Sequence, residues 1–194
     1  MTISRYSEKN ALNYQELKNL KNYSYQKILT KILDEKTKNL DTKVDQNYLN
    51  EIVLWKVNRY AAFNDETILL LNRIKEENAE EINTELTKEV LSSLLKTPGV
   101  QLPMASTILR FMNPKIYQIY DQRVGRFIDF ENPHGGIQSA KNEALVAKTV
   151  DFYLGYLQRL QDISKEKNVE FELLDRVLYI ADKEENKDIA LKKK

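Results

Sequence analysis

The sequence contains no cysteine and only one histidine, His134, among its 194 residues. Without thiolates the chain can form neither disulfides nor iron–sulfur clusters nor cysteine-ligated zinc sites. A single histidine is too few for a histidine-based metal site. We therefore expect no metal and no cofactor.

Long apolar runs are also missing. No stretch approaches 18 apolar residues, and the first ten residues, MTISRYSEKN, lack the apolar centre of a signal peptide. We therefore expect a cytoplasmic protein without a membrane-bound segment. The apolar share of 42% and the charged share of 30% are typical of a globular protein with a buried core. The oligomeric state is left open.

Glycine and proline are scarce, and neither occurs before Pro98. Nothing in the first half of the chain therefore breaks helices strongly, and apolar residues recur there at helical spacing. No segment alternates with period two for long enough to form a sheet. The sequence predicts an all-α fold of about eight or nine helices. The predicted spans are 24–38, 45–63, 65–77, 85–95, 102–112, 122–130, 139–165 and 170–183, with a weaker one within 1–22 and a charged, disordered tail at 186–194.

The stretch 94–126 concentrates three of the four prolines and two of the five glycines. It predicts a tight turn between two helices, followed by Pro103 in the first helical turn, where its missing N–H costs nothing. Such a turn places unpaired N–H groups and a positive helix end at one spot, which can bind phosphate. The alternative is a plain turn between packed helices. The turn residues are Thr97, Pro98, Gly99, Val100 and Gln101.

Basic charge gathers on the same stretch. The chain as a whole carries a formal net charge of +1, but residues 96–128 hold five cations and one carboxylate, a local charge of +4. Within a Debye length of about 10 Å such local charge matters more than the total. The cations are Lys96, Arg110, Lys115, Arg123 and Arg126, and the carboxylate is Asp121.

The whole stretch resembles the helix-hairpin-helix DNA glycosylase superfamily, which includes endonuclease III and the adenine and alkylation-damage glycosylases. The family pattern is roughly L-P-G-V-G-x-x-x-A, a helix, and an apolar connection that ends in V-D-x-x-[VI]-x-R with a catalytic aspartate. Asp121 follows Gly99 by 22 residues, which is the family's spacing. The matching segments here are residues 97–101 (TPGVQ), Ala105 and residues 120–126 (YDQRVGR).

The resemblance implies a single helical domain over 1–194 with two lobes, both termini in one lobe, and a hairpin-plus-aspartate segment at 85–130 beside the cleft. It further implies DNA as partner and a monofunctional base excision, in which the ionised Asp121 stabilises positive charge on the deoxyribose and positions water. Lys96, Arg110, Arg123 and Arg126 would contact DNA together with the turn. The alternatives are a catalytically inactive module that binds the DNA backbone and a helical interaction protein.

Two positions depart from the family pattern. Gln101 replaces the second hairpin glycine and would restrict the backbone if φ were positive there. Pro103 stands where bifunctional members keep their Schiff-base lysine, so no lyase activity is expected. The cysteines of the endonuclease III branch are absent, so the resemblance implies no iron–sulfur cluster.

Aromatic and polar residues elsewhere are candidates for a base pocket, because aromatic rings can stack on an unpaired base. The alternative is that the tryptophan and the tyrosines belong to the core, and that Asp121 only caps a helix, a contribution of about 1 kcal/mol. The candidates are Trp55, Asn58, Arg59, Tyr117 and Tyr120.

Overall fold

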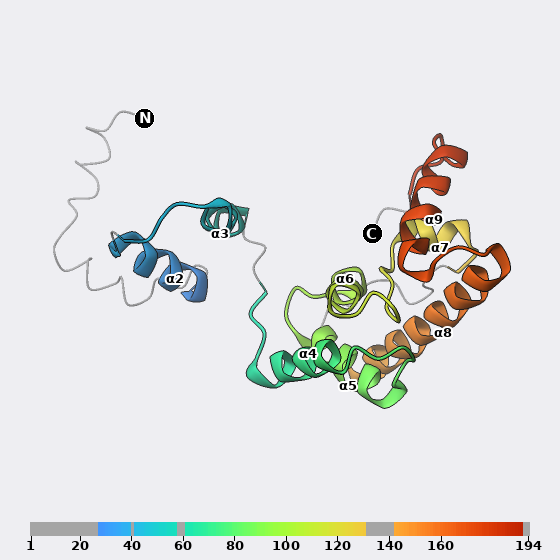
Figure 1. Cartoon of the computed structure of the whole chain (residues 1–194), viewed down its shortest axis with the longest axis horizontal. Helices are drawn as coiled ribbons and strands as arrows, with labels where there is room; N and C mark the ends of the chain where they lie inside the picture. Colours follow the sequence, from blue (N-terminus) through green and yellow to red (C-terminus); the bar gives the residue numbers. More distant parts are fainter. Residues whose placement is uncertain (1–26, 40, 58–60, 131–141, 192–194) are drawn as a thin grey trace. The chain divides into compact units, whose positions relative to one another are not determined.

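A computed structural model describes residues 27–39, 41–57, 61–130 and 142–191 (Figure 1). In these ranges every regular element is a helix and no strand occurs, which confirms the predicted all-α fold. The weak helix predicted within 1–22 lies outside the described residues. The helices are α2 (Lys27–Lys38), α3 (Gln46–Val57), α4 (Asp65–Glu77), α5 (Thr84–Lys96), α6 (Leu102–Met112), α7 (Gln122–Phe127), α8 (Glu143–Lys167) and α9 (Phe171–Glu185).

Helix starts follow local capping chemistry. The side chains of Asn64, Asn83 and Asn142 each accept a hydrogen bond from a backbone N–H in the first turn of α4, α5 and α8. The predicted helix 122–130 is too long, because α7 ends at Phe127. There Asp129 adopts a φ of +53° and the Phe130 N–H donates to the Gly125 carbonyl, which closes the helix.

The chain divides into two compact units, residues 1–60 and residues 61–194. Both ends of the chain, residues 1–26 and 192–194, lie outside the described residues, so their placement in one lobe stays a prediction. In the first unit, the Trp55 indole N–H donates to the Thr30 hydroxyl at 2.9 Å, which ties α3 to α2. Helix α3 has no buried residue, and in α2 only Leu29 is buried.

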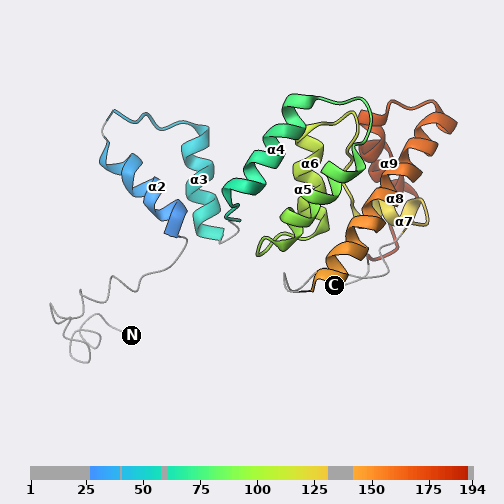
Figure 2. The same cartoon turned by 90° about the horizontal axis from the view of Figure 1, so that it is seen from below.

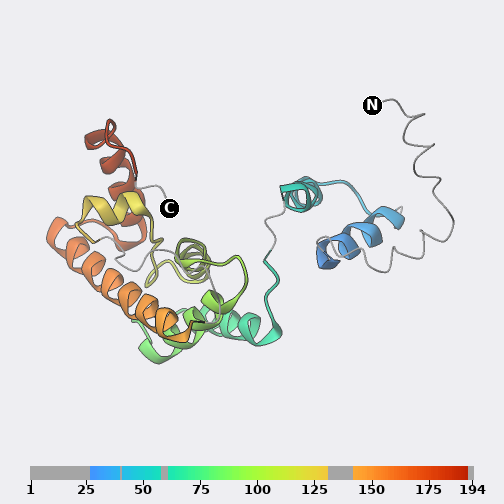
Figure 3. The same cartoon turned by 180° about the vertical axis from the view of Figure 1, so that it is seen from behind.

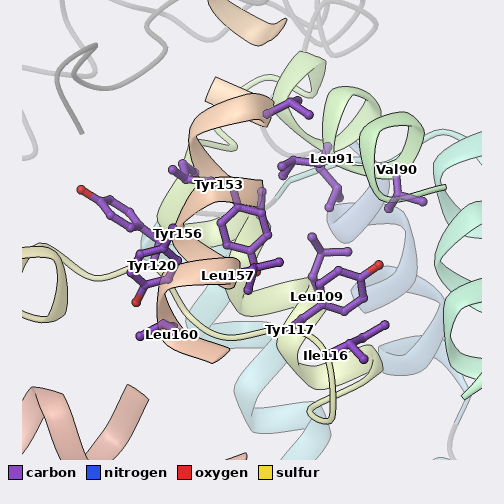
Figure 4. Close-up of a cluster of buried hydrophobic side chains, with 14 of the residues drawn as sticks. Val90, Leu91, Leu109, Ile116, Tyr117, Tyr120, Tyr153, Tyr156, Leu157 and Leu160 are labelled. Carbon is purple, nitrogen blue, oxygen red and sulfur yellow. The ribbon is translucent and has the colours of Figure 1, made fainter. Parts of the chain in front are cut away.

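The second unit contains the hydrophobic core. Helix α5 packs against α4, α6 and α8, while α7 packs against α9 (Figures 2 and 3). Leu91, Leu109 and Leu157, from α5, α6 and α8, are completely buried and meet in one cluster (Figure 4). Burial of such a leucine stabilises the fold by about 2 kcal/mol.

The connection from α6 to α7 runs through this core rather than over its surface. Ile116, Tyr117 and Tyr120 are at most 5% exposed, and Gln118 is completely buried. The α5–α6 hairpin and the residue that follows the connection, Asp121, are therefore parts of one packed unit. None of the helices in the described ranges is long and apolar enough to cross a membrane.

The C-terminal tail is described as far as Leu191. After α9, the Ile189 carbonyl accepts a hydrogen bond from the Arg126 guanidinium at 3.1 Å. Residues 186–191 thus contact α7, and the disorder predicted for 186–194 stays a prediction.

Candidate functional site

The predicted tight turn joins α5 to α6. The Val100 N–H donates to the Thr97 carbonyl at 3.1 Å, and Gly99 between them has a φ of +82°. Proline second and glycine third in such a turn are the pattern of a type II turn. A Cβ added to Gly99 would meet no atom of the described residues within 4 Å, so the backbone angle, and not the space, demands glycine.

Gln101 fits its position without strain. Its φ of −110° and ψ of 171° are extended backbone, so the restriction considered for a positive φ does not arise. Gln101 is the N-cap of α6 but makes no side-chain capping hydrogen bond, and Pro103 lies in the first turn. The first turn of α6 therefore keeps backbone N–H groups that the capping side chain does not satisfy.

Asp121 is the N-cap of α7. One oxygen of its half-buried carboxylate, Oδ1, accepts a hydrogen bond from the Arg123 N–H at 2.7 Å. The other oxygen, Oδ2, has no donor among the described residues. Asp121 thus acts as a cap, as predicted, and still offers a second oxygen to another group.

Ser106 links the aspartate to the hairpin. This completely buried α6 residue accepts a hydrogen bond from the Tyr120 N–H at 3.0 Å, and its hydroxyl donates to the Pro103 carbonyl at 3.1 Å. Asp121 is consequently one residue away from a direct contact with the first half of α6. Ser106 was not among the residues predicted from the sequence. Its signal was a polar residue directly after Ala105 of the matched pattern.

Two tyrosines of α8 fix the connection just before Asp121 (Figure 4). The Tyr153 hydroxyl donates to the Gln118 carbonyl at 2.8 Å, and the Tyr156 hydroxyl donates to the Ile119 carbonyl at 2.9 Å. Burial raises the pKa of both hydroxyls well above the usual value, so both remain protonated donors. The backbone that leads to Asp121 is therefore bound at consecutive positions.

The two tyrosines proposed for a base pocket lie in the core. The Tyr120 ring packs edge-on against Phe152 and Tyr156, with ring centroids 5.2 Å apart in each pair. The hydroxyl of Tyr117 is 2.7 Å from the Thr87 hydroxyl, and burial raises its pKa. Their surroundings are those of the core alternative, and a base-pocket role for them stays a prediction.

All four cations predicted to contact DNA have partners within the chain. Arg110 is only 8% exposed and donates to the Glu172 carbonyl at 3.0 Å, while Arg123 and Arg126 both bind Asp182. Lys96 remains half exposed and pairs with a Glu143 carboxylate on the surface. The structure thus gives the three arginines a role in packing, and their contact with DNA stays a prediction.

Asp182, on α9, is a buried carboxylate that the sequence analysis did not single out. Its Oδ1 accepts from Arg126 Nε at 2.9 Å and from Asn186 Nδ2 at 3.0 Å. Its Oδ2 accepts from Arg126 Nη2 at 2.7 Å and from Arg123 Nη1 at 3.2 Å. Hydrogen bonding to Arg126, above all, lowers the pKa of Asp182 and keeps it ionised. We call these four residues the Asp182 cluster.

The remaining candidates belong to the first unit or fall outside the described residues. Trp55 is partly buried and bonded to Thr30, which gives it a packing role within its own unit. Asn58, Arg59 and His134 lie outside the described residues. Across the described ranges no three His, Asp or Glu side chains gather in a way that could bind a metal ion.

Comparison of the chain with protein-family models, with curated proteins and with solved structures gives no match.

Proposed function

We propose that this protein binds DNA in the cytoplasm and acts in repair as a monofunctional glycosylase, with Asp121 as the catalytic carboxylate. The observation that carries the proposal is the pairing of two features. A half-buried carboxylate with one unbonded oxygen stands at the N-terminus of α7, and the Ser106–Tyr120 hydrogen bond attaches it to the hairpin.

In this proposal the α5–α6 hairpin binds the DNA backbone. Unsatisfied N–H groups at a helix N-terminus bind phosphate without reading the sequence. Since the side chains of Arg110, Arg123 and Arg126 are mostly buried, we assign the phosphate contacts mainly to the backbone of residues 98–101 and to Lys96. Lys96 pairs with Glu143, but both side chains of this pair are exposed on the surface.

Asp121 would then act on a nucleotide flipped out of the duplex. As the C1′–N bond breaks, positive charge develops on the deoxyribose, and a fixed carboxylate nearby stabilises it. The base leaves with the electron pair of the broken bond, water adds its oxygen to C1′, and the proton that the water loses passes through solvent to the departing base. The helix N-terminus favours the ionised form of the carboxylate that this step needs. No lysine is required.

A base-release assay over a broad panel of damaged and mismatched duplexes tests this proposal. Asp121→Asn should lower the single-turnover rate by about 10²- to 10³-fold, because it removes the stabilising charge. Asp151→Asn, which changes an exposed carboxylate on α8, is the matched control and should leave the rate unchanged. Equal rates for Asp121→Asn and the wild type would refute the mechanism.

A binding measurement separates the enzyme from the inactive module. Affinity for duplex DNA without lesions should fall steeply with salt and should weaken in Lys96→Ala. Binding without any base release from the whole panel would assign the backbone-binding module instead. Absence of binding at low salt would exclude both and leave a helical interaction protein.

A further inference from the structure

We propose that Asp182 is a positioning residue that keeps the Asp121 carboxylate in place through α7. The inference rests on the proposed function for its catalytic consequence, but the placement of Asp121 that it describes can be measured without activity. Asp182 belongs to α9 and lies 61 positions after Asp121 along the chain.

Helix α7 cannot fix its own orientation. It has only six residues, from Gln122 to Phe127, and isolated helices much shorter than about 12 residues are not stable in water. Its direction therefore depends on what anchors it. The connection anchors its N-terminal end through Ser106, and the Asp182 cluster anchors it against α9.

Arg123 contacts both Asp121 and Asp182. Its backbone N–H donates to Asp121 Oδ1 at 2.7 Å, while its guanidinium Nη1 donates to Asp182 Oδ2 at 3.2 Å. Arg126, three residues on, is on the same side of the helix and binds both oxygens of the same carboxylate. A shift of α7 that breaks the cluster would therefore also move the N–H that orients Asp121.

The carboxylate of Asp182 uses all of its hydrogen-bonding capacity within the chain. It is completely buried, and each of its two oxygens accepts two hydrogen bonds. Asparagine has nearly the same shape but replaces one oxygen with an NH₂ group, which can only donate. In Asp182→Asn this NH₂ would face guanidinium donors, so two of the four hydrogen bonds are lost and the arginines keep their charge.

The experiment compares amide hydrogen exchange in the full-length wild type and in Asp182→Asn. The Arg123 amide should exchange about fivefold faster in the variant, as expected for a weakened cap. The Val100 amide, in the hairpin turn, should keep its rate and is the internal reference. Glu184→Gln changes an exposed carboxylate on the same helix and should move neither amide.

A second readout separates positioning from general destabilisation. In Asp182→Asn the single-turnover rate of base release at saturating enzyme should fall by about 10²-fold, while the Kd for DNA changes by less than about twofold. Asn64→Ala removes the N-cap of α4, 57 positions before Asp121 in the sequence, and should lower stability without this fall in rate. If Asp182→Asn does not fold, Arg123→Gln removes one of the four donors and should show a smaller change in the same direction.

The outcomes distinguish the two proposals. Unchanged exchange at Arg123 in Asp182→Asn, or an equal loss of rate in Asn64→Ala, overturns the positioning role. If the wild type releases no base, the proposed function fails, and the exchange comparison still decides whether Asp182 positions Asp121.

Discussion

The turn at residues 97–101 is closed by one backbone hydrogen bond, between Val100 and Thr97. The position of Asp121, in contrast, is held by side chains that lie far from it in the sequence. Around Gly99 a Cβ would meet nothing within 4 Å. Around Asp121, by contrast, Ser106 and Tyr156 bind the backbone just before it, and Asp182 binds the helix just after it. The difference teaches that local residue types set the shape of the turn, while partners distant in the sequence place the carboxylate of Asp121.

The largest effect should come from the support of Asp121. Asp182→Ala should lower the free energy of unfolding by about 3 kcal/mol, because it leaves two partly buried arginines without their carboxylate. Denaturant unfolding followed by circular dichroism measures this change. Glu184→Ala, on the exposed side of α9, should stay within about 0.5 kcal/mol of the wild type. An equal loss of unfolding free energy in Asp182→Ala and Glu184→Ala would contradict the claim that Asp182 supports the helix after Asp121.

The same variant should respond to acid in a defined way. The folded-state pKa of Asp182 is lowered by Arg126 and Arg123, so its contribution to stability is complete above the unfolded pKa of about 3.9. That contribution is lost as the pH falls further through the folded-state pKa. The stability difference between wild type and Asp182→Ala should therefore be constant near neutral pH and shrink below about pH 4.

Gly125→Ala should have the next largest effect. The new Cβ would lie 2.9 Å from the Phe130 carbonyl oxygen and 3.3 Å from both Cε2 and the hydroxyl oxygen of Tyr120. Such overpacking should cost about 2 kcal/mol and disturb the residue before Asp121. Gly155→Ala, whose Cβ would meet only Phe130 Cζ at 3.4 Å, should instead stabilise helix α8 by about 0.5 kcal/mol. A loss of stability in both variants would mean that α8 is packed more tightly than these distances indicate.

Ser106→Ala should have the next smaller effect and lower the free energy of unfolding by about 1 to 2 kcal/mol, because the buried Tyr120 N–H would lose its acceptor. Thr107→Ala is the matched control. Thr107 also donates to the Pro103 carbonyl but makes no bond to the connection. Its replacement should change the unfolding free energy by less than about 0.5 kcal/mol, measured by thermal unfolding of the three proteins.

Gly99→Ala should have the smallest effect on stability and should leave Asp121 alone. A φ of +82° is unfavourable for alanine by about 1 kcal/mol, and no side chain would be displaced. Amide exchange should quicken at Val100 and stay unchanged at Arg123. A change at Arg123 as large as that at Val100 would show that the two regions are not supported independently.

Much of the fold could be predicted from the sequence, because helix boundaries depend on neighbouring residues. Helices α4 and α6 have the bounds that were predicted, 65–77 and 102–112, and Asp121 caps α7. The end of α7 was missed, since it results from the positive φ of Asp129 and the bond between Phe130 and Gly125, for which no local residue type gave a signal.

The partners of the arginines could not be predicted, for a related physical reason. The sequence pattern around a cationic residue on a helix does not show whether its side chain faces solvent or a buried carboxylate. Only the folding of α9 against α7 reveals that Asp182 binds Arg123 and Arg126. Local charge therefore overstates how many cations are available to a phosphate backbone.

The large sequence separation between the residues of the Asp182 cluster also affects the order in which parts of the chain fold. Arg126 and Asp182 are 56 residues apart, so their contact must close a long loop, while the hairpin turn joins residues three positions apart. Closure entropy grows with loop length, and local contacts tend to form before distant ones. We therefore expect a refolding chain to acquire its hairpin first. The carboxylate of Asp121 would reach its final position only after α8 and α9 have folded.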